Sequence, residues 1–161
     1  MVASQGSAAA QCATVNTAPF TNSTPSNCIT IYTTGTYTGD LTNNSTLTPT
    51  GSYSPGIPGT ATGISILKTG VTLNGNIINA GTIDANTIPG KQIGINIGEG
   101  ATNSVNQNAG AVLNGSITNS GTINSQVGIW VSGNSSPLLS TVTGSISNAA
   151  GGLINYTNNG I

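Results

Sequence analysis

Few residues in this chain could do acid–base or nucleophilic chemistry. There is no histidine and no arginine, and only five side chains are charged: Asp40, Lys68, Asp84, Lys91 and Glu99. A catalytic triad or a Cys–His pair needs an imidazole base. Polysaccharide cleavage needs two carboxylates close together, whereas Asp84 and Glu99 are half a sequence repeat apart and Asp40 is remote from both. We therefore expect a protein that is not an enzyme, with a polysaccharide-active enzyme as a distant alternative.

Metal and cofactor sites are not expected either. Zinc sites draw on clusters of cysteine and histidine, and calcium-binding β-rolls carry a glycine–aspartate nonapeptide. Neither pattern occurs in the chain. The isolated charges Lys68, Asp84, Lys91 and Glu99 are interpreted as solvated loop or edge residues.

The two cysteines, Cys12 and Cys28, are close together near the N-terminus. A disulfide between them would close a short loop and stabilise the fold by roughly 3 kcal/mol in the chain-entropy model. The alternative is two buried free thiols. We favour the disulfide because the composition indicates export, where disulfides persist. The preceding segment Ser7–Gln11 resembles the small-residue tail of a signal-peptide cleavage site.

Trp130 is the residue best suited to ligand binding. Its neighbours in the expected strand, Ile129 and Val131, should point toward the protein core, so the indole should point outward. Alignment of the Gly-Ile pairs described below would place it in one column with Ser65 and Asn96. An exposed indole beside small polar groups could bind a sugar face or a partner chain. The alternative is that Trp130 packs under the loop Ser132–Leu139.

The low charge excludes several classes of partner. Nucleic acids are bound through phosphate contacts from Lys and Arg, and two lysines cannot form a basic face. An anionic membrane surface is excluded for the same reason, and no apolar run approaches the ~20 residues needed to span a bilayer. A formal net charge of −1 offers little repulsion between copies, so self-association is physically easy.

A phrase of the form Gly-x-Ile-x-Asn-x-Gly-x-Ile recurs along the chain. Clear copies span 75–83 and 115–123, and looser ones span 144–154 and 39–47. The pair Gly-Ile recurs at 63–64, 94–95, 128–129 and 160–161, in steps of 31, 34 and 32 residues. Such self-similarity indicates stacked units. Alternating Ile and Val with abundant Thr predicts short strands.

These repeats predict an all-β fold, a parallel β-helix (solenoid) with three short strands in each coil. Strands would pair one coil apart, about 4.8 Å along the axis, and Asn79, Asn119 and Asn148 would stack as a corner ladder. The coils are expected over residues 61–161. Residues 1–60 are expected to form an irregular N-terminal cap region, with strands at 28–32 and 36–38 and a Pro/Gly-rich surface loop at 49–59. The alternative fold is an antiparallel sandwich.

The phrases at 75–83 and 115–123 resemble repeats of autotransporter (type V secreted) passenger domains and related bacterial surface adhesins. The likeness covers residues 61–161. It implies a right-handed β-helix exported through the periplasm and displayed on a Gram-negative cell surface, as an N-terminal piece of a longer solenoid. It also implies adhesion, autoaggregation or biofilm formation. The closely spaced Cys12 and Cys28 agree with the cysteine usage of this family.

The predicted partners are therefore sister molecules, host or abiotic surfaces, or neutral glycans. The main alternative is a structural subunit that polymerises into an extracellular fibre through open coil ends. Ice binding is a distant alternative suggested by the Thr-rich strands at 30–34 and 36–38. We expect it to fail because the threonines do not recur coil by coil in the sequence.

Overall fold

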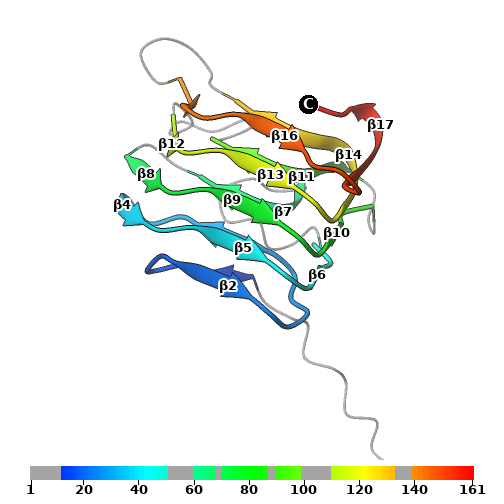
Figure 1. Ribbon diagram of the computed structural model, residues 1–161, viewed down its shortest axis with the longest axis horizontal. Helices are drawn as coiled ribbons and strands as arrows, with labels where there is room; N and C mark the ends of the chain where they lie inside the picture. Colours follow the sequence, from blue (N-terminus) through cyan, green and yellow to red (C-terminus); the bar gives the residue numbers. More distant parts are fainter. Residues whose placement is uncertain (1–11, 51–59, 68–69, 87–89, 99–109, 133–138) are drawn as a thin grey trace, which may run out of the picture.

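The computed structural model describes residues 12–50, 60–67, 70–86, 90–98, 110–132 and 139–161. These residues form strands and no helix. All strand pairs are parallel and belong to three sheets of eight, four and five strands. Figure 1 shows the five-stranded sheet face on, with its strands stacked in chain order from β2 to β16. The fold class is thus all-β with parallel sheets, and the antiparallel alternative is excluded.

Strands that pair with each other lie one coil apart in the sequence. The five-stranded sheet contains β2 (Phe20–Asn22), β5 (Leu41–Asn43), β9 (Ile77–Asn79), β13 (Ile117–Asn119) and β16 (Ile146–Asn148). The four-stranded sheet contains β4 (Gly35–Thr38), β8 (Val71–Asn74), β12 (Val112–Asn114) and β15 (Thr141–Val142). The eight-stranded sheet contains β1 (Ala13–Thr14), β3 (Ile29–Ile31), β6 (Thr46–Leu47), β7 (Thr60–Ile66), β10 (Thr82–Asp84), β11 (Lys91–Ile97), β14 (Thr122–Val131) and β17 (Leu153–Asn159).

The register follows the repeats found in the sequence. Ile64, Ile95 and Ile129 are paired across β7, β11 and β14. The Gly-Ile pair therefore occupies the same position in each of these coils. Side chains of a strand alternate between two faces, and in-register pairing therefore stacks the isoleucines in one buried column. Ile64 and Ile95 have no exposed surface and Ile129 is 2% exposed. This arrangement fits a β-solenoid.

The expected change of architecture at residue 60 does not appear among the described residues. Strands before this position pair in parallel with those after it: β3 with β7, β4 with β8, β5 with β9 and β6 with β10. Residues 29–47 therefore form a coil like the later ones, and 12–26 contribute part of another. The predicted strands at 28–32 and 36–38 correspond to β3 and β4. Most of the predicted loop at 49–59 lies outside the described residues.

Buried asparagines form a ladder at the corner after the five-stranded sheet. The side-chain Nδ2 of each Asn donates to the Oδ1 of the Asn in the next coil: Asn22 to Asn43 (2.9 Å), Asn43 to Asn79 (2.8 Å), Asn79 to Asn119 (2.7 Å) and Asn119 to Asn148 (2.7 Å). The predicted residues Asn79, Asn119 and Asn148 are thus in one ladder, which begins two coils earlier than expected.

The same amides also hold the turn that follows each strand. Asn43, Asn79 and Asn119 each donate from Nδ2 to the backbone carbonyl two residues later, at Ser45, Gly81 and Gly121. A buried amide without partners costs free energy. The ladder therefore explains why Asn recurs where the backbone bends between the two sheets.

A glycine stands two residues after Asn79 and after Asn119, where neighbouring coils approach each other closely. A Cβ atom at Gly121 would overlap the carbonyl oxygen of Gly81 in the coil below, and a Cβ at Gly81 would overlap the carbonyl oxygen of Ser45. Backbone-to-backbone contact of this kind leaves no flexible group that could move aside. The repeated phrase thus contains Gly at this position for steric reasons.

We expect Gly121→Ala to lower the free energy of unfolding by at least about 2 kcal/mol, because the added methyl forces two coils apart. Ser120→Ala, at the preceding exposed position, should change it by less than about 0.5 kcal/mol. Urea unfolding followed by circular dichroism measures both values. Equal stability of the two variants would show that the coils are not in this close contact.

We expect Asn79→Ala to cost roughly 2–4 kcal/mol, because it leaves Asn43 Nδ2 and Asn119 Oδ1 buried without this partner. The matched control is Asn114→Ala, since Asn114 also donates to an Asn one coil away, Asn74 at 2.9 Å, but on the exposed surface. The control should cost about 0.5 kcal/mol or less. Similar losses in urea melts of both variants would mean that the buried ladder contributes no more than the exposed one.

Candidate functional site: the outer face of β7, β11 and β14

The outer face of β7, β11 and β14 is the first candidate site because the coils differ in length beside it. The connections that lead into or out of these strands have unequal lengths: 48–59, 67–70, 85–90, 98–111 and 132–140. The corners between the four- and five-stranded sheets stay short, at 75–76 and 115–116. In solenoid proteins, insertions concentrated on one face often mark the binding face.

The predicted column of Trp130, Asn96 and Ser65 is present on this face. Ser65 pairs in register with Asn96, and Asn96 pairs with Trp130. Thr30 extends the column by one coil, and Ser65 Oγ donates to Thr30 Oγ1 at 3.0 Å. The sequence therefore predicted correctly which residues are neighbours.

The predicted exposure of this column is wrong. Ser65 is 1% exposed and Asn96 has no exposed surface, so neither can contact a ligand from solution. Trp130 is only half-buried. Alternation along a strand tells which side chains point away from the core, but it does not tell whether that outer side is covered. The alternative, in which Trp130 packs under Ser132–Leu139, concerns residues that lie mostly outside the described part of the chain.

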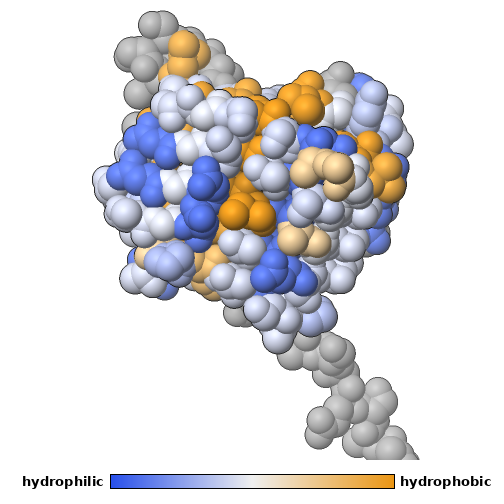
Figure 2. Space-filling view, in the orientation of Figure 1, coloured by the Kyte–Doolittle hydropathy of each residue, from blue (hydrophilic) through white to orange (hydrophobic). Residues whose placement is uncertain are grey.

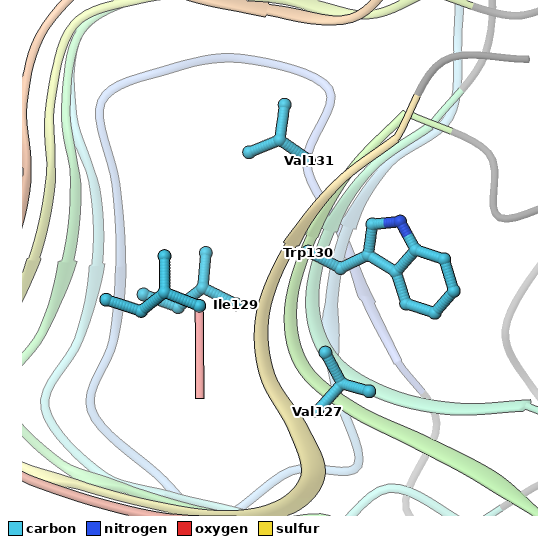
Figure 3. Close-up of a pocket in the computed structure, with 5 residues that line it drawn as sticks. Val127, Ile129, Trp130 and Val131 are labelled. Carbon is cyan, nitrogen blue, oxygen red and sulfur yellow. The ribbon is translucent and has the colours of Figure 1, made fainter. Parts of the chain in front are cut away.

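Lys91 is an unexpected neighbour of Trp130. Its ammonium Nζ lies 3.1 Å from the centre of the indole ring, so Lys91 is not the isolated solvated charge expected from the sequence. Figure 3 shows the indole on the outer side of β14, with Ile129 on the inner side. Partial burial lowers the pKa of Lys91 below its ordinary value of 10.5, because the charged form loses water. No spacing rule indicates this contact, since the two residues are in different coils.

Several polar atoms on this part of the fold are buried without a hydrogen-bond partner. They are Nδ2 and Oδ1 of Asn96 and Oγ1 of Thr62. Thr62 is paired in register with Ile93, and Ile93 with Val127. Figure 3 places Val127 on the same outer side of β14 as Trp130. Among the described residues, the face thus combines the side chains of Ile93 and Val127 with an aromatic ring, one cation and buried polar atoms that lack hydrogen-bond partners.

The two carboxylates among the described residues lie on different parts of the fold. Asp40 Oδ1 accepts hydrogen bonds from the backbone N–H and from Nδ2 of Asn76, at 2.7 and 3.1 Å. Asp84 belongs to β10 of the eight-stranded sheet and is paired in register with Asn124, whereas Asp40 lies between β4 and β5. Glu99 and Lys68 lie outside the described residues. Within the described ranges, no three His, Cys, Asp or Glu side chains are grouped to hold a metal ion.

Cys12 and Cys28 form a disulfide. Ala13 pairs with Ile29 in β1 and β3, so the bridge joins the residues that precede a parallel pair. It ties the short strand β1 to the stack beside the buried residues Ile29 and Ile31. Its position indicates a structural role in the first described coil.

Two columns of the structure contain threonines from neighbouring coils, whereas the column of Thr30 continues with Ser65, Asn96 and Trp130. Thr46, Thr82 and Thr122 form one column in the eight-stranded sheet. Thr36 and Thr72 pair in the four-stranded sheet. Leu153 follows Thr122 in the first of these columns and Val112 follows Thr72 in the second, so threonines do not recur in every coil, as expected from the sequence.

The chain matches no protein-family model, no curated protein and no solved structure. Over the described residues, no helix is long and apolar enough to cross a membrane.

We expect the Trp130 emission spectrum to change with pH around the lowered pKa of Lys91. The ammonium loses its proton below pH 10.5, and the cation–π contact then disappears. Because the folded pKa is lowered, the unfolded chain binds more protons between that pKa and 10.5, and stability should rise with pH in this window. Fluorescence titration of the only tryptophan measures the transition.

The control for this titration is Lys91→Gln, which keeps a polar side chain and removes the titrating group. The transition should be absent in this variant, while any contribution from other groups persists. Identical titration curves for the two proteins would show that Lys91 does not contact the indole in solution.

Proposed function

We propose that this chain is a non-catalytic adhesive segment of an autotransporter-type passenger. It would be wound as a right-handed parallel β-helix, exported and displayed on the bacterial cell surface. Adhesion, autoaggregation or biofilm formation would result from contact between its side faces and sister molecules, abiotic or host surfaces, or neutral glycans. The observation that carries this proposal is the regular, uncharged and exposed outer face of the four-stranded sheet.

This face contains hydroxyl and amide groups stacked coil on coil, with the half-buried Val112 between Thr72 and Thr141. Its exposed residues come from strands paired in register: Thr36, Thr38, Asn74, Asn114 and Thr141. The outer column of the five-stranded sheet is more buried, since Thr42, Ile78, Thr118 and Ser147 are all half-buried. Figure 2 shows that side of the molecule, mostly white to blue with separate orange areas. The four-stranded sheet thus offers the more accessible polar surface.

The energetics suit many weak contacts. Each hydrogen bond across such a surface would contribute ~1 kcal/mol net, so one face binds weakly while an array of rods binds strongly through multivalency. None of the exposed residues named for this face is charged, so contact should depend little on salt. Ser65 and Asn96 are buried, so Trp130 alone of its column could take part in such contact.

We expect beads coated with the chain to aggregate, with little difference between 50 mM and 1 M NaCl. The double variant Thr36→Lys/Asn114→Lys adds like charges to the four-stranded face. It should reduce aggregate size several-fold at low salt, with recovery at high salt. The matched control, Thr21→Lys/Thr118→Lys, places the same charges on the five-stranded sheet and should aggregate as the unmodified chain does. Dynamic light scattering measures aggregate size.

Beads that stay dispersed at every salt concentration, together with no retention on neutral glycans, would contradict the proposal. A freezing-point hysteresis in the absence of bead aggregation would instead favour ice binding through the threonine columns. Circular dichroism checks that the lysine variants remain folded.

A further inference from the structure

An Asn-Gly pair occupies the same corner of the fold in two neighbouring coils. Asn74 and Asn114 are the last residues of β8 and β12, and they are paired in register. Each is preceded by leucine and followed by glycine, at the turn toward the five-stranded sheet. An asparagine side chain reacts most readily with its own backbone when glycine follows, because glycine has no Cβ atom to hinder the approach. The two corners therefore carry the same reactive group.

A third Asn-Gly pair spans 159–160. The side chain of its asparagine lies outside the described part of the structure.

The corner at Asn74 is held by backbone hydrogen bonds on both sides. Gly75 N–H donates to the carbonyl of Asn114 in the next coil at 3.2 Å, and Gly39 N–H of the previous coil donates to the carbonyl of Asn74 at 2.9 Å. The two side chains are both exposed, and Asn114 Nδ2 donates to Asn74 Oδ1 at 2.9 Å. Any movement of the Gly75 nitrogen toward the Asn74 side chain would break a hydrogen bond between coils.

The corresponding hydrogen bond is missing at Gly115. Its acceptor would be the carbonyl of Thr143, since Leu113 pairs with Val142 in the residues just before. Among the described residues, however, Gly115 N–H donates to no backbone carbonyl, and its own carbonyl accepts from Gly144 N–H at 3.0 Å. The Gly115 nitrogen can therefore lose its proton to solvent and turn toward its neighbouring side chain without breaking such a bond.

We propose that Asn114 is a site of deamidation in the folded protein, and that the hydrogen bond from Gly75 protects Asn74 from the same reaction. The Gly115 nitrogen gives its proton to hydroxide and attacks Cγ of Asn114. The bond from Cγ to Nδ2 breaks, and Nδ2 takes a proton from water and leaves as ammonia. Water then opens the succinimide ring at either carbonyl, which gives aspartate or isoaspartate. Water and hydroxide are the only co-reactants.

The product would place a carboxylate on the exposed face of the four-stranded sheet. A carboxylate can only accept hydrogen bonds, so the contact from position 114 to Asn74 Oδ1 would be lost. Each modified copy would also carry a negative charge on the face proposed for adhesion, and copies would repel one another at low salt. Deamidation would then weaken adhesion as the protein ages. This consequence rests on the proposed function, whereas the reaction itself does not.

The reaction is tested by incubating the chain at mildly alkaline pH, folded and unfolded in urea, with mass spectrometry of digests at successive times. In the folded chain we expect Asn114 to deamidate about fivefold faster than Asn74 or more, because only Asn74 must break a hydrogen bond first. In urea the two rates should agree, because both sites have the sequence Leu-Asn-Gly. Amide hydrogen exchange should also be faster at Gly115 than at Gly75.

Equal rates at the two sites of the folded chain would overturn the proposal. So would an unmodified Asn114 in the folded chain while the unfolded chain reacts, or equal hydrogen exchange at the two glycines. The control Asn114→Gln keeps the amide but would have to close a larger ring, so the product at this position should disappear while Asn74 continues to react.

Asn114→Asp tests the consequence for adhesion separately, because it supplies the product directly. Beads coated with this variant should form aggregates about twofold smaller than the unmodified chain at low salt and equal to it at high salt. Equal aggregation at low salt, with deamidation observed at Asn114, would contradict the role of this face in adhesion and leave the modification site established.

Discussion

The fold depends on the ladder of buried asparagine amides that joins successive coils. Each amide in the middle of the ladder donates to the coil above and accepts from the coil below, as Asn79 does between Asn43 and Asn119. Slippage of one residue would turn these amides outward and bury the side chains between them. Such a shift would also remove the isoleucines from the interior. The ladder therefore fixes the register that the apolar columns alone would only favour.

A fixed register at this corner lets the chain vary elsewhere. The short turns beside the asparagines keep nearly constant length, whereas the connections flanking β7, β11 and β14 differ from coil to coil. The insertions leave the stack intact because the strands on either side return to the same partners. The adhesive face proposed above is on the four-stranded sheet, whose exposed residues come from paired strands. Its regularity thus follows from the same constraint that holds the core.

The sequence predicted the stack correctly where a residue type is required by packing. Gly-Ile pairs and the recurrent Asn have sterically or electrostatically fixed roles, so their spacing could be recognised. The prediction from the sequence was wrong for the coil at 29–47, because unequal connections obscure the period and because Leu41 and Asn43 lie in only a faint copy of the repeated phrase. The burial of Ser65 and Asn96 and the contact between Lys91 and Trp130 could not be predicted. Alternation within one strand contains no information about what covers its outer side.

The near absence of charge in the composition is itself a consequence of stacking. A repeated phrase places the same residue in one column about 4.8 Å apart, where like charges repel by nearly 1 kcal/mol even in water, while Asn and Thr can hydrogen-bond to their own kind. The described charges agree with this constraint. Asp84 is in register with Asn124, and Lys91 with Thr60, so neither has a like charge directly above or below it in the paired strands. Stacking of similar coils therefore disfavours charged residues at the repeated positions.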